Sequence, residues 1–95
     1  MTEIIFSREA VDDLIAQAQF IFEQTQNVDS ADRYLDGMKS FIVETLSHFP
    51  RAGRPAEEIV PGSRKLVYQG YSVLYRIAED HIEILTIYRE NLPSL

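Results

Sequence analysis

Side chains that could carry catalysis or bind a metal ion are scarce in this 95-residue sequence. It contains no cysteine, which excludes disulfides and thiolate zinc sites. Its two histidines, His48 and His81, lack a second histidine or carboxylate at the spacing of a metal-binding motif. His81 and Glu83 would share one face of a strand, but we favour the interpretation of a solvated turn histidine. We therefore expect no metal site.

Carboxylates and glycines also lack an arrangement typical of a cofactor site. The pairs Asp12-Asp13 and Glu57-Glu58 fall on a polar helix face and in a loop, where we expect them to face solvent. The four glycines are too isolated to form a phosphate-binding loop. We predict no cofactor.

The basic side chains are few and unevenly placed. Residues 1–48 hold three basic and nine acidic side chains, which accounts for the whole net charge of −6. The second half is neutral, and its basic residues gather at Arg51, Arg54, Arg64 and Lys65. A nucleic-acid-binding domain is usually basic with a coherent positive face. We therefore expect no strong direct binding to nucleic acid.

The first half of the chain predicts one strand and two helices. Residues 3–6 read as a short strand, and Ser7 is a good N-cap for a helix that ends near residues 26–27. A second helix should begin at Asp29 or Ser30 and end before Pro50, antiparallel to the first. The apolar stripe of the first helix consists of Val11, Leu14, Ile15, Ala18, Ile21 and Phe22. Phe20 falls on the opposite face, where a large aromatic side chain suggests contact with a partner.

The second half predicts a β-meander. Residues 50–63 are rich in proline and glycine and should form an irregular connection. Strands are expected at 64–68, 71–77 and 82–88, with the odd-numbered side chains of 71–77 pointing inward. The last strand should be central or covered on both faces, and the first strand should lie at a sheet edge or beside it. The predicted fold is α+β, with the order strand, antiparallel helical hairpin, three-stranded antiparallel meander, in a single domain over residues 1–95.

The N-terminal residues give an expectation for the cellular location of the protein. It reaches charged residues by Arg8-Glu9, too early for a signal peptide or a membrane-spanning segment of about 20 residues. We expect a cytoplasmic protein without membrane contact.

Several ordered motifs in the second half resemble a known group of proteins. They are Phe49-Pro50-Arg51-Ala52-Gly53-Arg54-Pro55, then Arg64-Lys65-Leu66, then Gly70-Tyr71-Ser72-Val73-Leu74-Tyr75-Arg76-Ile77. Placed between a helical hairpin and an Ile-Glu-Ile-Leu strand, they are similar to the RelE/ParE superfamily of toxins from bacterial toxin-antitoxin modules. The resemblance spans essentially the whole chain and is closest to the ParE branch, often called plasmid stabilisation proteins.

For the RelE branch, the resemblance implies ribosome-dependent cleavage of messenger RNA by clustered basic residues and a proton donor. In RNA-cleaving members an arginine follows the Gly-Tyr pair, where this chain has Ser72, and a basic run follows the last strand, where it has Glu90-Asn91. The residues left for such a site are Arg64, Arg76, Tyr88 and Arg89.

For the ParE branch, the resemblance implies a toxin that binds DNA gyrase, needs no catalytic residue of its own and is neutralised by an antitoxin encoded by a neighbouring gene. We take this as the leading hypothesis, with inhibition by protein–protein binding. The alternatives are a messenger RNA interferase acting on the ribosome, and a non-toxic relative that only binds antitoxin and takes part in autoregulation. Candidate antitoxin or target contacts are Phe20, Arg51, Arg54, Arg64, Arg76 and Arg89. An apolar groove beside the helical hairpin or along the sheet should accept the antitoxin.

Overall fold

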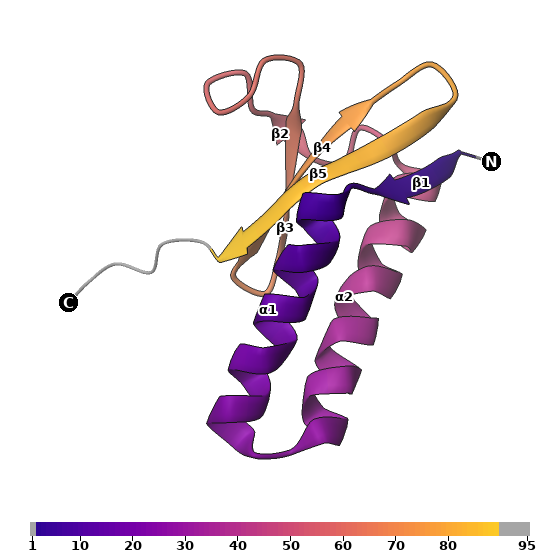
Figure 1. Ribbon diagram of the computed structural model, residues 1–95. Coiled ribbons are helices and arrows are strands. Elements are labelled where there is room, and N and C mark those ends of the chain that lie inside the picture. The colour runs from indigo at the N-terminus through magenta and orange to yellow at the C-terminus, as the bar shows by residue number, and fades with distance from the viewer. Residues whose placement is uncertain (1, 90–95) are drawn as a thin grey trace.

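The computed structural model describes residues 2–89, in which two antiparallel helices pack on one face of a five-stranded sheet (Figure 1). The elements are β1 (Glu3–Phe6), α1 (Arg8–Thr25), α2 (Val28–His48), β2 (Arg54–Pro55), β3 (Arg64–Tyr68), β4 (Tyr71–Ile77) and β5 (His81–Arg89). The α+β class and the helical hairpin are confirmed. The helices continue past the end of the sheet, so the end of the hairpin at its turn has no strand beneath it (Figure 1).

The strand order is β1-β5-β4-β3-β2, with β1 parallel to β5 and every other pair antiparallel. The expected edge position of the first strand is confirmed. The last strand is paired on both sides, by β1 and β4, but the central strand of the sheet is β4. The prediction of an irregular connection over residues 50–63 was wrong at Arg54 and Pro55, which pair with Lys65 and Arg64. Proline has no amide proton to donate, and an edge strand is the part of a sheet that tolerates it.

The helix ends follow local capping chemistry. The Ser7 hydroxyl accepts a hydrogen bond from the Ala10 amide at 3.0 Å, as predicted. The predicted cap at Asp29 or Ser30 was wrong, because Asn27 is the N-cap of α2 and accepts from the Ser30 amide at 3.1 Å. The cause is the left-handed conformation of Gln26 (φ 55°), which ends α1 and leaves Asn27 extended at the start of the next helix.

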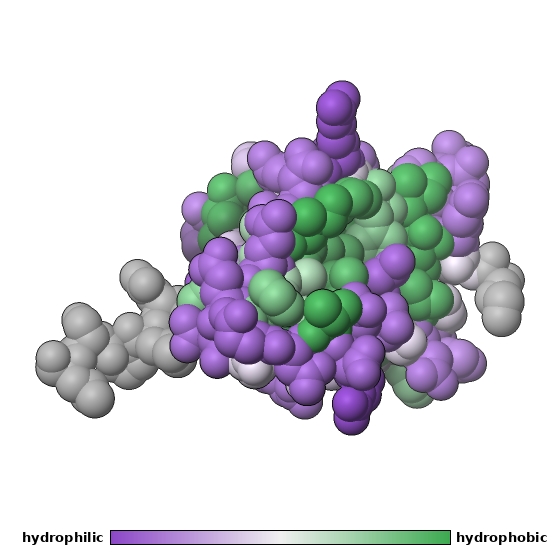
Figure 2. Space-filling model, turned by 60° about the horizontal axis from the view of Figure 1, so that its bottom comes forward, coloured by the Kyte–Doolittle hydropathy of each residue, from purple (hydrophilic) through white to green (hydrophobic). Residues whose placement is uncertain are grey.

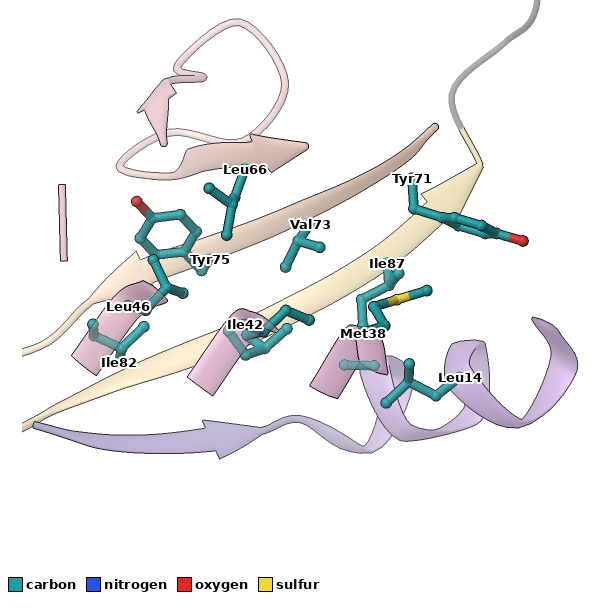
Figure 3. Packing of buried hydrophobic residues seen from close by; sticks show 12 residues of the cluster. Leu14, Met38, Ile42, Leu46, Leu66, Tyr71, Val73, Tyr75, Ile82 and Ile87 are labelled. Carbon is teal, nitrogen blue, oxygen red and sulfur yellow. The ribbon is translucent and has the colours of Figure 1, made fainter. Parts of the chain in front are cut away.

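Side chains from both helices and from β3, β4 and β5 form one core (Figure 3). Its main members are Leu14, Met38, Ile42, Leu46, Leu66, Tyr71, Val73, Tyr75, Ile82, Ile84 and Ile87. The odd-numbered residues 71, 73 and 75 point into it, as predicted. The predicted alternation along β4 was nevertheless wrong, because Ser72 and Leu74 on the other face are also buried. Leu74 is paired with Lys65 on one side and Thr86 on the other, and side chains of paired residues cover one another.

Residues at the start of α1 bond to the part of β5 that β1 does not reach. β1 pairs only with residues 81–84, and beyond them the Ser7 hydroxyl donates to the Leu85 carbonyl at 2.8 Å. One carboxylate oxygen of Asp13 then accepts from the Ile87 amide at 2.9 Å and from the Thr86 hydroxyl at 2.8 Å. The expectation that Asp13 only faces solvent was therefore wrong, since it satisfies an amide that no strand reaches.

Within residues 2–89, neither helix is long and apolar enough to cross a membrane.

Candidate functional site: an apolar groove on the helical hairpin

A groove of about 510 Å³ runs between the two helices on the outer face of the hairpin. It is lined by Ile15, Ala18, Gln19, Phe22, Glu23, Val28, Ala31 and Leu35. Ile15 is 50% exposed, Phe22 39% and Val28 60%, values that are high for large hydrophobic side chains. Figure 2 shows hydrophobic side chains gathered in a band on this side of the molecule, between margins of hydrophilic ones.

The groove contains half of the apolar stripe predicted for α1, namely Ile15, Ala18 and Phe22. Leu14 of that stripe is buried, but Val11, Ile15 and Phe22 are exposed. The sequence period identified the apolar face of α1 but did not distinguish its buried residues from its exposed ones. Phe22 and Val28 lie close to the turn between α1 and α2, at the end of the hairpin that reaches past the sheet (Figure 1).

A second, smaller concavity of about 270 Å³ lies beside the β3–β4 turn. Its lining residues are Phe20, Ile21, Tyr34, Gln69, Gly70, Tyr71 and Arg89. The guanidinium carbon of Arg89 lies 4.6 Å from the centroid of the Phe20 ring, which is a cation–π geometry. Two residues that were singled out separately in the sequence are therefore in contact.

Tyrosines form the inner wall of this concavity. The Tyr34 ring meets Tyr71 edge-on, with centroids 5.6 Å apart, and the Tyr71 hydroxyl donates to Gln17 at 2.8 Å. Burial, followed by the neighbouring tyrosines Tyr71 and Tyr68, raises the pKa of Tyr34 to about 12. Sequence reasoning treated Tyr34 only as a member of the apolar stripe of α2. Nothing in that period distinguishes a wall residue from a core residue.

Arg64 holds the loop that follows α2. Its Nε donates to the Gly53 carbonyl at 2.8 Å and its Nη2 to the Arg51 carbonyl at 3.2 Å. The buried hydroxyl of Tyr75 donates to the Pro50 carbonyl at 2.8 Å and accepts from the Gly53 amide at 2.9 Å. These four hydrogen bonds fix the backbone of residues 50–53.

Two more of the candidate antitoxin or target contacts, Arg51 and Arg54, lie in or next to this loop. Arg54 is exposed, and its guanidinium lies 3.1 Å from the Glu58 carboxylate and 3.0 Å from the Pro55 carbonyl. The Arg51 side chain is exposed. The structure thus gathers Arg51, Arg54 and Arg64 at one end of the molecule, and Phe20 with Arg89 lies at another.

The four residues suggested for an interferase site do not come together. Arg64 and Arg89 are paired with Tyr75 and Tyr71, so both lie on the helix-covered face of the sheet, four residues apart along β4. Tyr88 is paired with Ser72 and Arg76 with Glu83, which places both on the opposite face. On each face, the two candidate residues are four strand positions apart, which is roughly 13 Å along the strand at about 3.3 Å per residue. Arg76 is also engaged in an ion pair of 2.8 Å with Glu83.

The histidines have local partners only. His48 Nδ1 lies 2.9 Å from the Glu44 carbonyl, and His81 Nδ1 lies 2.8 Å from the Asp80 carboxylate. The hydrogen bond from His81 lowers the pKa of Asp80. Across residues 2–89 there is no group of three side chains that could hold a metal ion. The departures noted at Glu90 and Asn91 lie outside the described residues.

The fold and the groove define a small α+β domain that presents an open apolar face on a helical hairpin. Among known families, the one described as "ParE toxin of type II toxin-antitoxin system, parDE" matches residues 4–91. The chain belongs to this family, which confirms the resemblance to the RelE/ParE superfamily.

Solved structures agree. The "Chromosomal ParDE TA system from P. aeruginosa" contains a chain with 27% identity and a TM-score of 0.81, covering 96% of this chain and 98% of that one. A chain of the toxin-antitoxin complex RelBE2 from Mycobacterium tuberculosis has 23% identity and a TM-score of 0.69, covering 94% of this chain and 98% of that one. The second likeness concerns the fold alone. Comparison with curated proteins gives no significant match.

Proposed function

We propose that this chain is a cytoplasmic toxin that inhibits its target by protein–protein binding and is neutralised when a cognate antitoxin occupies the groove between α1 and α2. DNA gyrase is the target we propose, in keeping with the ParE branch. The whole chain, residues 1–95, acts as one domain.

The exposed apolar groove carries this proposal. An amphipathic helix binds such a groove by inserting apolar side chains at helical spacing. The exposed side chains of Ile15, Phe22 and Val28 supply the walls, and the small side chains of Ala18 and Ala31 leave space between them. Desolvated apolar contacts of this kind provide most of the binding free energy in interfaces. The similar chain from the P. aeruginosa ParDE system supports a partner of the antitoxin class.

The dispersed arginines support binding over catalysis. Cleavage of RNA requires charged groups and a proton donor around one phosphate. Arg64 instead donates to two backbone carbonyls, and Arg76 and Tyr88 lie on the other face of the sheet.

Expression of the chain alone in a bacterial host, with parallel measurements of plasmid supercoiling and message cleavage, tests this proposal. We expect growth arrest, loss of gyrase supercoiling and intact messenger RNA, and co-expression of the antitoxin should restore growth. Cleaved messages with normal supercoiling would instead establish the interferase alternative. Normal growth together with tight antitoxin binding would establish the non-toxic relative.

A further inference from the structure

The turn that follows α2 presents an aromatic ring and a positive charge to solvent. Phe49 is 68% exposed, the highest value for a large hydrophobic side chain in residues 2–89. Its ring lies beside that of His48, with centroids 6.4 Å apart. Arg51 is exposed, and its guanidinium makes no hydrogen bond or ion pair within residues 2–89. Neither side chain contributes to the core, so both are available for contact with another molecule.

The backbone beneath these two side chains is held independently of them. The Phe49 amide donates to the Thr45 carbonyl at 2.7 Å, and the Ala52 amide donates to the Phe49 carbonyl at 2.9 Å, which closes a turn with Pro50 at its second position. Proline fixes its own φ at that position. Arg51 contributes only its carbonyl, as the acceptor of a hydrogen bond. The turn is therefore preorganised, and its backbone loses little conformational entropy when a partner binds.

Two concavities meet at Arg51. The first, of about 560 Å³, has a mainly apolar lining that consists of His48, Phe49, Pro50, Arg51 and Ala52. The second, of about 350 Å³, is mainly polar and is lined by Arg51, Pro55, Glu57, Gly62, Ser63, Arg64 and Ile77. A partner that carries an apolar side chain next to a charged one can therefore fill both concavities at once.

The surroundings of this turn are basic, although the chain as a whole is acidic. Residues 45–78 hold five basic and two acidic side chains, or +3, whereas the remaining residues hold four basic and thirteen acidic ones, or −9. Both acidic residues of this segment are engaged, since Glu57 accepts from the Gly62 amide at 3.0 Å and Glu58 pairs with Arg54 at 3.1 Å. This distribution attracts an acidic partner to the turn and repels it from the rest of the molecule.

This turn lies at the end of α2 that is farther from the hairpin turn (Figure 1). His48 is thirteen residues beyond Leu35, the last residue of α2 to line the groove. At about 1.5 Å per residue, this is roughly 20 Å along the helix axis. Among residues 2–89, the groove and the two concavities share no lining residue. Substitutions at the turn therefore leave the groove unaltered.

We infer that this turn is the contact for the target of the toxin, with an apolar side chain of the target beside Phe49 and an adjacent carboxylate paired with Arg51. The inference rests on the proposed function. Aromatic and arginine side chains carry much of the binding free energy at interfaces. One unpaired guanidinium suits one carboxylate, whereas single-stranded nucleic acid requires a row of cations along its phosphates. Neutralisation then requires that an antitoxin on the hairpin obstructs the approach of the target, not that it fills this site.

Phe49→Ala and Arg51→Glu in the full-length chain test this inference. Three quantities are measured for each variant: growth after induction, affinity for purified DNA gyrase and affinity for the cognate antitoxin. We expect each substitution to relieve growth arrest and to weaken gyrase binding by at least about tenfold, as for a central interface residue. Antitoxin affinity should stay within about threefold of wild type, as expected for residues outside the interface. Arg51→Lys keeps the charge and should weaken gyrase binding less than Arg51→Glu.

Val67→Ala and Arg33→Glu are the matched controls, because Val67 is 54% exposed on β3 and Arg33 is an exposed cation of α2. Both should keep wild-type growth arrest and gyrase affinity. An unchanged urea unfolding midpoint for Phe49→Ala and Arg51→Glu shows that the fold is preserved.

Undiminished growth arrest and gyrase affinity in both turn variants would overturn the inference and leave the proposed function intact. A comparable loss of antitoxin affinity would also overturn it, because the turn would then belong to the antitoxin interface. So would a wild-type dimer that Phe49→Ala dissociates, or binding of a single-stranded oligonucleotide that Arg51→Glu abolishes. If the wild-type chain neither arrests growth nor binds gyrase, the proposed function itself fails.

Discussion

The Tyr75 hydroxyl accepts a hydrogen bond of 2.9 Å from the Gly53 amide, across 22 positions of the chain. The same oxygen donates to the Pro50 carbonyl at 2.8 Å, so one side chain satisfies two backbone groups of the loop after α2. Figure 3 shows this hydroxyl at the end of a ring that otherwise packs among Leu46, Leu66 and Ile82. The core of the domain and the loop that carries Arg51 are therefore joined through a single buried phenol.

Tyr75→Phe should lower the free energy of unfolding by about 1–3 kcal/mol, because it leaves the Gly53 amide unpaired inside the protein. Urea denaturation measures this change. Tyr71→Phe is the control, since the Tyr71 hydroxyl is only partly buried and bonds to a side chain, and it should cost less than about 1 kcal/mol. Equal losses in the two variants would contradict the role given to Tyr75.

Gly53→Ala should destabilise the protein by about 1–3 kcal/mol, because an added methyl group meets atoms that cannot all move. It would lie 2.6 Å from the Lys65 carbonyl oxygen and 2.8 Å from the Tyr75 ring. Thermal or urea unfolding provides the measurement.

Gly37→Ala is the comparison for this variant. An added methyl group at Gly37 would lie 3.2 Å from the Tyr68 hydroxyl alone. Alanine gains about 1 kcal/mol of helix propensity over glycine, which offsets a small displacement of that side chain. The stability of Gly37→Ala should remain within about 1 kcal/mol of wild type. A larger loss than that of Gly53→Ala would refute this account of the two glycines.

Arg64→Lys should loosen the loop even though it keeps the positive charge, because an ammonium cannot reproduce the fork that donates to the Gly53 and Arg51 carbonyls. We expect a loss of about 1–2 kcal/mol in stability and faster hydrogen exchange at the Gly53 amide. Arg76→Ala breaks an exposed ion pair and should cost less than about 1 kcal/mol. Wild-type exchange in Arg64→Lys would show that charge alone matters at this position.

Phe22→Glu and Ile15→Glu should each weaken antitoxin binding by at least about 30-fold, the effect of losing a central apolar contact. Calorimetric titration of the purified pair gives the affinities. Val67→Glu is the matched control, because Val67 is 54% exposed but lies on β3, away from the groove. The groove is not the antitoxin site if Val67→Glu weakens binding as much as Phe22→Glu.

Tyr34 should make stability depend on alkaline pH. Its pKa rises from an ordinary 10.0 to about 12 in the folded protein, so folding favours the protonated phenol. The corresponding stability is fully present below pH 10 and is lost as the pH rises through about 12. Tyr34→Phe should show a smaller decrease in unfolding midpoint over this range than wild type. Absorbance of the phenolate gives the titration directly, and identical pH profiles for the two proteins would contradict the assignment.

Most of the fold follows from local patterns in the sequence. The Ser7 cap, the apolar period of the helices and the alternation at 71, 73 and 75 placed the main elements within a few residues. The errors have local causes as well as distant ones. Asn27 became the helix cap because Gln26 adopts a left-handed conformation, and Arg54 and Pro55 joined the sheet because β3 offered an edge to pair with.

The candidate site was much harder to predict. The sequence identified Arg64, Arg76, Tyr88 and Arg89 by type, but strand register decides which of them share a face. Pairing places Arg64 opposite Tyr75 and Arg76 opposite Glu83, so the two guanidiniums leave the sheet on different sides. Phe20 was noticed as an exposed aromatic residue, and its contact with Arg89 joins residues from α1 and β5.

By itself, the sequence determined the family, the element order and the presence of an apolar face on each helix, because these depend on residue types at short spacing. Only the tertiary structure decided which apolar residues become core and which remain as a groove. That outcome depends on which side of α1 a residue occupies: Leu14 packs in the core, whereas Ile15, about 100° further round the helix, lines the groove and stays half exposed. Burial is a property of what packs against a residue, and residues distant in the chain supply that packing.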